Sequence, residues 1–399
     1  MTEFEDKATV TLMRLQNALA NVIADYGDPV ILRPIDLCEL ININMNVAWK
    51  INRLVNSTDV FSFGKYLPGR KALNNLCESA SKAGSSTLKV TELKEASTEL
   101  DVFIRTHAGS RKEFDLMLAN LSIEERHGND SVHRRKSFEG NSYTFGVQCD
   151  VNLSTNIIIP SKLRDDSLDI CRIRGQVGLR LIRPDVPWRV TSTYITDSDG
   201  KQKSSSNSEY LFCSNTSDAP VAREFCTPNL PEFDCKTSKT GRTSYFLKNM
   251  EMGMQSSISV FTVELMKNAG PMYRKNPTDA FALNTTSRIP AKSFVVEMYV
   301  PREFDSGSCR TEMWSRLFVS TDPSERIAGD VLPLGEQPVV YPIGRVPVPV
   351  PGISNYGNLL SKSFVELKID PRNYRLLRLT IDYPPIPVGI SLMMKHPKM

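Results

Sequence analysis

Apolar residues recur at helical spacing along the first third of the chain. Leu12, Leu15 and Leu19 lie about one turn apart and predict a helix over residues 5–24, which a Gly-Asp-Pro turn then ends. The same spacing predicts further helices over residues 34–41, 45–55, 73–80, 88–105 and 111–121. We therefore expect an all-helical N-terminal domain over residues 1–125.

Beyond Gly140 the pattern changes to short runs that alternate apolar and polar residues or are rich in β-branched residues. The predicted strands are Tyr143–Val151, Ile157–Ile159, Ile170–Ile182, Trp188–Ile195, Ile258–Leu265, Ser293–Val300, Arg316–Ser320, Phe364–Ile369 and Arg375–Tyr383. This order of elements predicts an α+β protein whose C-terminal part, residues 141–399, is a β-sandwich or jelly-roll-like body of one or two subdomains.

Two segments fit neither pattern. Residues 126–140 are polar and charged, and we interpret them as a basic linker or exposed arm. Residues 332–351 are rich in Pro and Val, which predicts an extended segment with few ladder hydrogen bonds.

The stretch PIDLCELININMNVAWKINR, residues 34–53, has the apolar spacing of a helix-turn-helix. Such a motif would bury Leu37, Ile41, Ile43, Ala48 and Ile51 between its helices. Asn42 falls at the turn, where a left-handed backbone is needed and Asn is well tolerated. The second helix would then be presented to a DNA major groove.

Several polar side chains of this motif are suited to DNA. Asn pairs with adenine edges and Arg or Lys with guanine, and Trp packs on sugars or thymine methyl groups. The predicted DNA contacts are Arg33, Asn44, Asn46, Trp49, Lys50 and Arg53. Two alternatives stay open: helix pairs of this kind also occur in domains that bind no DNA, and Trp49 fits a core position.

Basic residues beside the motif are candidates for phosphate contacts. Between Arg33 and Lys71 there are six Lys and Arg residues against three acids, a net charge of +3. Lys65, Arg70 and Lys71 are predicted to hold the DNA backbone. Arg134, Arg135 and Lys136 form a second basic cluster, in the linker, which fits either a groove-following arm or a solvated charge run.

Charge over the whole chain does not single out the helical part. The formal net charge is +4, with 18 Lys and Arg against 19 acids up to Gly140, and 31 against 26 after it. The positive excess therefore lies in the predicted β body, which leaves open an acidic partner or nucleic acid there.

No pattern in the sequence indicates catalysis, a metal or a cofactor. Walker, Gly-x-Ser-x-Gly and His-Glu-x-x-His motifs are absent, and we expect no enzyme. Cys213, Cys226 and Cys235 are too widely spaced for a zinc site, so no metal is expected. The polar start of the chain and the lack of a long apolar run predict a cytoplasmic protein with no membrane partner and reduced thiols.

The segment from Arg33 to Gly84 resembles the N-terminal helix-turn-helix regions of bacterial DNA-binding transcriptional regulators. The residues that carry this resemblance are PIDLCELININMNVAWKINRLV and the following PGRKAL. The resemblance implies binding to double-stranded DNA and covers only the N-terminal part, since residues 141–399 resemble no family that we identify.

We therefore expect a DNA-binding protein, a transcriptional regulator, with a β body for oligomerisation or effector sensing. A single motif of modest charge would bind weakly, so a homo-oligomer that pairs half-sites is expected. The alternative is a structural protein whose β body assembles into a large oligomer, whose helical domain docks a partner, and whose segment 332–351 crosses onto a neighbouring copy.

Overall fold

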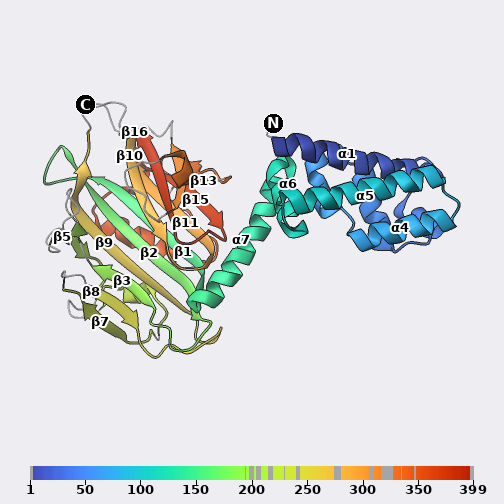
Figure 1. The fold of residues 1–399 in the computed structure, drawn as a ribbon. Coiled ribbons are helices and arrows are strands. Elements are labelled where there is room, and N and C mark those ends of the chain that lie inside the picture. Colours follow the sequence, from blue (N-terminus) through green and yellow to red (C-terminus); the bar gives the residue numbers. More distant parts are fainter. Residues whose placement is uncertain are drawn as a thin grey trace. The chain divides into compact units, whose positions relative to one another are not determined.

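A computed structural model gives the fold as mixed α+β, with helices first and a β-rich body after them (Figure 1). It describes residues 3–193, 195–196, 202–203, 208–213, 219–228, 230–239, 243–273, 280–304, 309–315, 327–333, 335–345 and 347–395. The chain forms two compact units, Met1–Asp130 and Ser131–Met399.

Helices make up the described part of the N-terminal unit. They are α1 (Glu3–Ile23), α2 (Pro34–Ile41), α3 (Met45–Val55), the 3-10 helix η1 (Val60–Lys65), α4 (Arg70–Lys82), α5 (Thr87–His107) and α6 (Arg111–Leu121). The long helices α1 and α5 run side by side (Figure 1). All the helices predicted for this part of the chain are therefore confirmed, with ends shifted by a few residues.

One apolar core joins these helices, and side-chain caps fix where several of them begin. Asp59 accepts a hydrogen bond from the Phe61 backbone N at the start of η1. Ser110 accepts one from the Glu113 backbone N at the start of α6. Gln16 of α1 donates to the Leu54 and Val55 carbonyls at 3.0 and 3.2 Å, which ties α1 to the C-terminal end of α3.

The predicted linker 126–140 lies within a long helix, α7 (Ile123–Phe145). The part from Ser131 onward belongs to the C-terminal unit, where Phe138 and Ser142 are buried. The Phe138 ring packs against Tyr383 with 5.4 Å between ring centres. This half of the segment is therefore helical and is anchored by Phe138, while most of its other residues are exposed.

The C-terminal unit contains two main sheets. Its longer strands are β1 (Val147–Pro160), β2 (Ser167–Leu181), β9 (Ile258–Pro271), β10 (Ala280–Ser287), β11 (Ala291–Pro301), β12 (Arg310–Ser315), β15 (Tyr374–Asp382) and β16 (Val388–Lys395). Shorter ones are β3 (Arg189–Thr193), β4 (Ile195–Thr196), β5 (Gln202–Lys203), β6 (Ser208–Tyr210), β7 (Phe233–Thr237), β8 (Thr243–Leu247), β13 (Val331–Leu332) and β14 (Val339–Tyr341).

The larger sheet has seven strands in the order β14-β15-β11-β1-β2-β9-β6, and the second has the order β10-β16-β12-β13. β1 is central in the larger sheet, antiparallel to β2 and parallel to β11. The described residues also form a three-stranded sheet, β3-β8-β7, and a two-stranded sheet, β4-β5. Short helices connect these strands: η2 (Arg223–Phe225), η4 (Ala328–Asp330), α8 (Tyr356–Glu366) and η5 (Pro371–Asn373).

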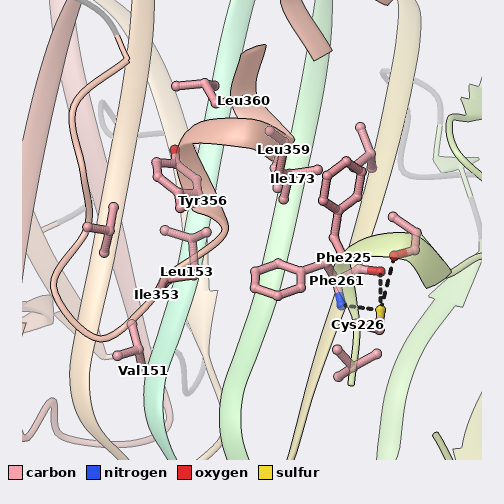
Figure 2. Close-up of a cluster of buried hydrophobic side chains, with 14 of the residues drawn as sticks. Val151, Leu153, Ile173, Phe225, Cys226, Phe261, Ile353, Tyr356, Leu359 and Leu360 are labelled. Atoms are coloured by element: carbon pink, nitrogen blue, oxygen red, sulfur yellow. Dashed lines mark hydrogen bonds between the residues drawn. The ribbon is translucent and has the colours of Figure 1, made fainter. Parts of the chain in front are cut away.

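Both faces of the seven-stranded sheet are apolar over much of their area. One face packs against the β10-β16-β12-β13 sheet through residues such as Ile158, Ile170 and Ile390. The other face is covered by α8 and η2, and Figure 2 shows Tyr356 and Leu359 of α8 over this part of the sheet. Burial on both faces explains why β1 reads as a continuous apolar run at Ile157–Ile159.

A buried ion pair crosses from β11 to β15. Glu297 and Arg378 lie opposite each other in the strand register, with 2.6 Å between Oε1 and Nη2. Tyr356 also donates to Glu297, and Thr155 donates to it at 2.9 Å. Each charge therefore has several partners, as a buried ion pair requires.

The Pro- and Val-rich segment packs on its own chain. β14 pairs with β15, and Arg378 donates to the carbonyls of Val348 and Pro349 at 2.8 and 2.7 Å. Residues 339–341, 348 and 349 of the predicted arm therefore contact β15 of their own chain. The Val348 and Pro349 carbonyls are used within the chain to complete the guanidinium shell of Arg378.

Two strand predictions need correction. Phe364–Ile369 was expected to be a strand, but Phe364 lies in helix α8, where Leu360 and Phe364 are buried one turn apart. Tyr143–Val151 begins as a strand only at Val147, because α7 continues through Phe145 and Gly146 then takes a φ of 70°. The predicted strand Arg316–Ser320 lies outside the described residues.

Candidate nucleic-acid interface

Helices α2 and α3 pack against each other through the predicted apolar positions. Leu37, Ile41, Ala48 and Ile51 are each at most 2% exposed, and Ile43 packs on them half-buried. One face of α3 is therefore fixed in the core of the N-terminal unit. The opposite face of α3 is the candidate surface.

The turn between the helices is set by two asparagines. Asn42 ends α2 with φ 57° and ψ 55°, the left-handed conformation predicted for this position. Asn44 begins α3, and its Oδ1 accepts a hydrogen bond from the Asn46 backbone N at 2.8 Å. The Asn44 oxygen is therefore engaged as a helix cap, which an Asn directly before a helix commonly indicates.

The outer face of α3 carries Met45, Asn46, Trp49 and Arg53, all exposed, while Lys50 is half-buried. Trp49 is 42% exposed, so the alternative that it is a core residue is wrong. Its ring packs edge-on against Tyr66 with 5.6 Å between ring centres, and Arg53 lies over its face. This face therefore combines an amide, an indole and a guanidinium within two helical turns.

The flanking cations differ in how much of their charge is already paired. Arg33 donates to both carboxylate oxygens of Asp36, at 2.7 and 2.9 Å, which raises the pKa of the Arg33 guanidinium and lowers that of Asp36. Arg70 pairs with Asp101 at 3.1 Å. Arg33 and Arg70 would have to share or exchange these partners to hold a phosphate.

Lys65 and Lys71 are both exposed. The Lys65 ammonium is 4.9 Å from the Tyr66 ring centre, and Tyr66 in turn touches Trp49. Met45 and Tyr66 were not among the predicted contacts. The i, i+4 spacing of residues 45, 49 and 53 is the signal that groups Met45 with the surface.

The second basic cluster belongs to the C-terminal unit. Arg134 forms an ion pair with Glu336 and is mostly buried there, and Arg135 pairs with Glu139 at 3.2 Å along α7. Lys136 is exposed. The structure therefore gives Arg134 a packing role within its own unit.

Across the described ranges, no group of three or more His, Cys, Asp or Glu side chains is placed to hold a metal ion. All eight cysteines are free thiols. Among the helices that the structure describes, none has the length and apolar character needed to cross a bilayer.

Comparisons with known proteins assign no family to the chain. No family model matches the chain, and no curated protein matches it. Among solved structures it is similar to a protein from Parabacteroides distasonis that is named a putative protease, at 8% identity and a TM-score of 0.24. That match covers 62% of this chain and 40% of the other, so the chain spans less than half of that protein.

Proposed function

We propose that this chain binds double-stranded DNA as a transcriptional regulator does, with α2 and α3 as a helix-turn-helix and α3 as the recognition helix. The observation that carries the proposal is the division of α3 into two faces. Ala48 and Ile51 are fully buried, whereas Asn46 and Arg53 on the other side are exposed. A helix held rigidly by one face and polar on the other suits the major groove.

Each residue of the exposed face has a chemical role in this proposal. Asn46 pairs with an adenine edge, and Arg53 pairs with guanine or a phosphate. Trp49 keeps Arg53 extended and packs on a sugar or thymine methyl group. Lys50, Lys65 and Lys71 supply charge to the DNA backbone, consistent with the net charge of +3 between Arg33 and Lys71.

In this proposal the C-terminal unit supplies oligomerisation or effector sensing. Its two main sheets share an apolar core, which supports a sandwich-like body. A homo-oligomer would present two copies of α3 to two half-sites and raise the affinity of a motif that binds weakly alone.

The proposal is tested with a pool of randomised short duplexes and the full chain, by fluorescence anisotropy. The triple variant Asn46→Ala, Lys50→Ala, Arg53→Ala is expected to lose at least about tenfold in affinity, since each lost base or phosphate contact costs about 1 kcal/mol or more. The matched control is Lys94→Ala, Arg105→Ala, Asn120→Ala, which removes the same side-chain types from exposed positions on α5 and α6. Equal affinity for the triple variant and wild type would refute the proposal.

A further inference from the structure

A pocket of about 550 Å³ lies on the seven-stranded sheet of the C-terminal unit. Its floor is formed by β2 and β9, and its walls come from the β3 and β8 strands and the end of β10. The volume is in the range of small-molecule sites. Nothing in the proposed DNA-binding role uses this pocket.

The floor of the pocket breaks the apolar pattern of its sheet face. Side chains two residues apart on a strand point to the same face. On β2, Leu168 and Ile170 lie in the core shared with the second sheet, whereas Arg172, Arg174 and Gln176 next along the strand line the pocket. The same face of β2 is therefore apolar core at one end of the strand and polar, charged pocket floor further along it.

The strand register brings further polar groups to the same floor. Arg172 lies opposite Glu264 of β9, and Arg174 lies opposite Thr262. Trp188, at the entry to β3, donates from Nε1 to Gln176 Oε1 at 2.9 Å. This hydrogen bond ties one wall of the pocket to its floor.

Charge in the pocket is strongly unbalanced. Its described lining includes four arginines, Arg172, Arg174, Arg189 and Arg288, and one carboxylate, Glu264, so the formal balance there is +3. Charges of one sign held close together in a cavity concentrate counter-ions, and guanidinium groups bind phosphate and carboxylate through paired hydrogen bonds.

Among the four arginines that line the pocket, Arg174 gives the strongest evidence for a bound anion. Its partners among the described residues are uncharged oxygens of Thr155, Asn156 and Ile173, at 3.3 to 3.5 Å. These are longer than ordinary N–H···O bonds, which lie near 2.9 Å. Burial and the charge of Arg172 lower the pKa of Arg174, a penalty that a bound anion would offset. The guanidinium still carries its charge near neutral pH.

We propose that this pocket binds a small organic anion with two or more phosphate or carboxylate groups, held by Arg174 and the arginines around it. The anion supplies short, charged hydrogen bonds, which the described residues do not give to Arg174. This proposal does not depend on DNA binding by α3, and its test uses no DNA.

Isothermal titration of the full chain at fixed ionic strength tests the proposal with pyrophosphate, citrate and uncharged adenosine as probes. We expect saturable binding of pyrophosphate, citrate or both, and no binding of adenosine. The anion that binds more tightly identifies the ligand as a phosphate or a carboxylate compound. Failure of both anions to bind, or equally tight binding of adenosine, would overturn the proposal.

Variants decide whether the binding occurs in this pocket. Arg174→Gln is expected to weaken the anion at least about tenfold, because truncating one side of a buried charged contact is costly. Arg288→Gln changes an exposed arginine of the same lining, so it keeps the test valid if Arg174→Gln fails to fold. Arg164→Gln is the matched control, since Arg164 is exposed and pairs with Asp166 outside the pocket. Unchanged binding in both pocket variants would refute the assignment.

Discussion

The guanidinium carbon of Arg53 lies 5.7 Å from the ring centre of Trp49, one turn earlier on the exposed side of α3. A cation over an indole face is worth about 0.5–1 kcal/mol at an exposed site. This contact holds the Arg53 side chain along the helix instead of leaving it free in solvent. In the proposed complex, part of its ordering is therefore complete before DNA arrives.

Trp49 should be shielded when DNA binds. It is 42% exposed, whereas Trp314 is 1% exposed. We expect acrylamide quenching of the protein's tryptophan fluorescence to fall when duplex DNA is added, because the duplex covers the indole. Trp49→Phe is expected to remove this change. A DNA-dependent change of the same size in Trp49→Phe would place the contact elsewhere.

The two faces of α3 should respond differently to truncation. Ile51→Ala opens a cavity in the core and is expected to lower the free energy of unfolding by about 2–5 kcal/mol. Trp49→Ala on the outer face is expected to cost less than about 1 kcal/mol, since surface substitutions have small effects. Urea unfolding followed by helical circular dichroism measures both, and equal costs would contradict the assigned faces.

The turn between α2 and α3 offers a test of backbone conformation. Asn42→Gly keeps the left-handed conformation without strain, so its stability should stay within about 0.5 kcal/mol of wild type. Asn42→Val forces a β-branched residue into that conformation and is expected to cost about 1–2 kcal/mol. Thermal unfolding compares the two. A Val variant as stable as the Gly variant would show that this turn relaxes to another conformation.

Breaking the buried Glu297–Arg378 pair should be more costly than replacing it. Arg378→Met leaves the Glu297 charge buried without its partner, which is expected to lower the free energy of unfolding by about 3–5 kcal/mol. The double variant Glu297→Leu, Arg378→Met should recover much of this loss. Urea unfolding of the single and double variants compares them, and a double variant no more stable than Arg378→Met would contradict this view.

The same pair predicts a pH dependence. Burial raises the pKa of Glu297, and removing Arg378 raises it further. A carboxyl with a raised pKa in the folded state favours folding most when it is protonated. Arg378→Met should therefore differ less from wild type in its free energy of unfolding as the pH falls from about 8 towards 5. A deficit that grows over this range would contradict the predicted direction.

The sequence predicts the helical part well because its signals are local. Ala48 and Ile51 are separated by one helical turn, and the left-handed residue Asn42 lies between two short helices, so no distant residue is needed to place them. The pairing of Arg33 with Asp36 is also local, at i, i+3 spacing, but whether a charge pairs or stays open depends on side-chain geometry that periodicity does not give.

The arginine pocket was not predicted, for a physical reason. Arg172 and Glu264 lie opposite each other only through the pairing of β2 with β9, across a long connection. Arg189 comes from β3, and Arg288 directly follows β10. The period-two placement of Arg172, Arg174 and Gln176 was visible in the sequence, but alternation alone does not tell a pocket floor from a solvated face. Residues Phe364–Ile369 were wrongly predicted to form a strand because so short a run does not distinguish the apolar spacing of a helix from that of a strand.

The salt dependence of DNA affinity tests the central claim, that the exposed face of α3 binds duplex DNA with Lys65 and Lys71 holding the DNA backbone. With three phosphate contacts we expect the affinity to fall about 40-fold between about 50 and 200 mM salt, linearly on logarithmic axes. The double variant Lys65→Ala, Lys71→Ala removes two of these contacts, so the slope of log affinity against log salt should become shallower by about 2. Affinity that does not change with salt, or no binding at the lowest salt concentration, would contradict the account.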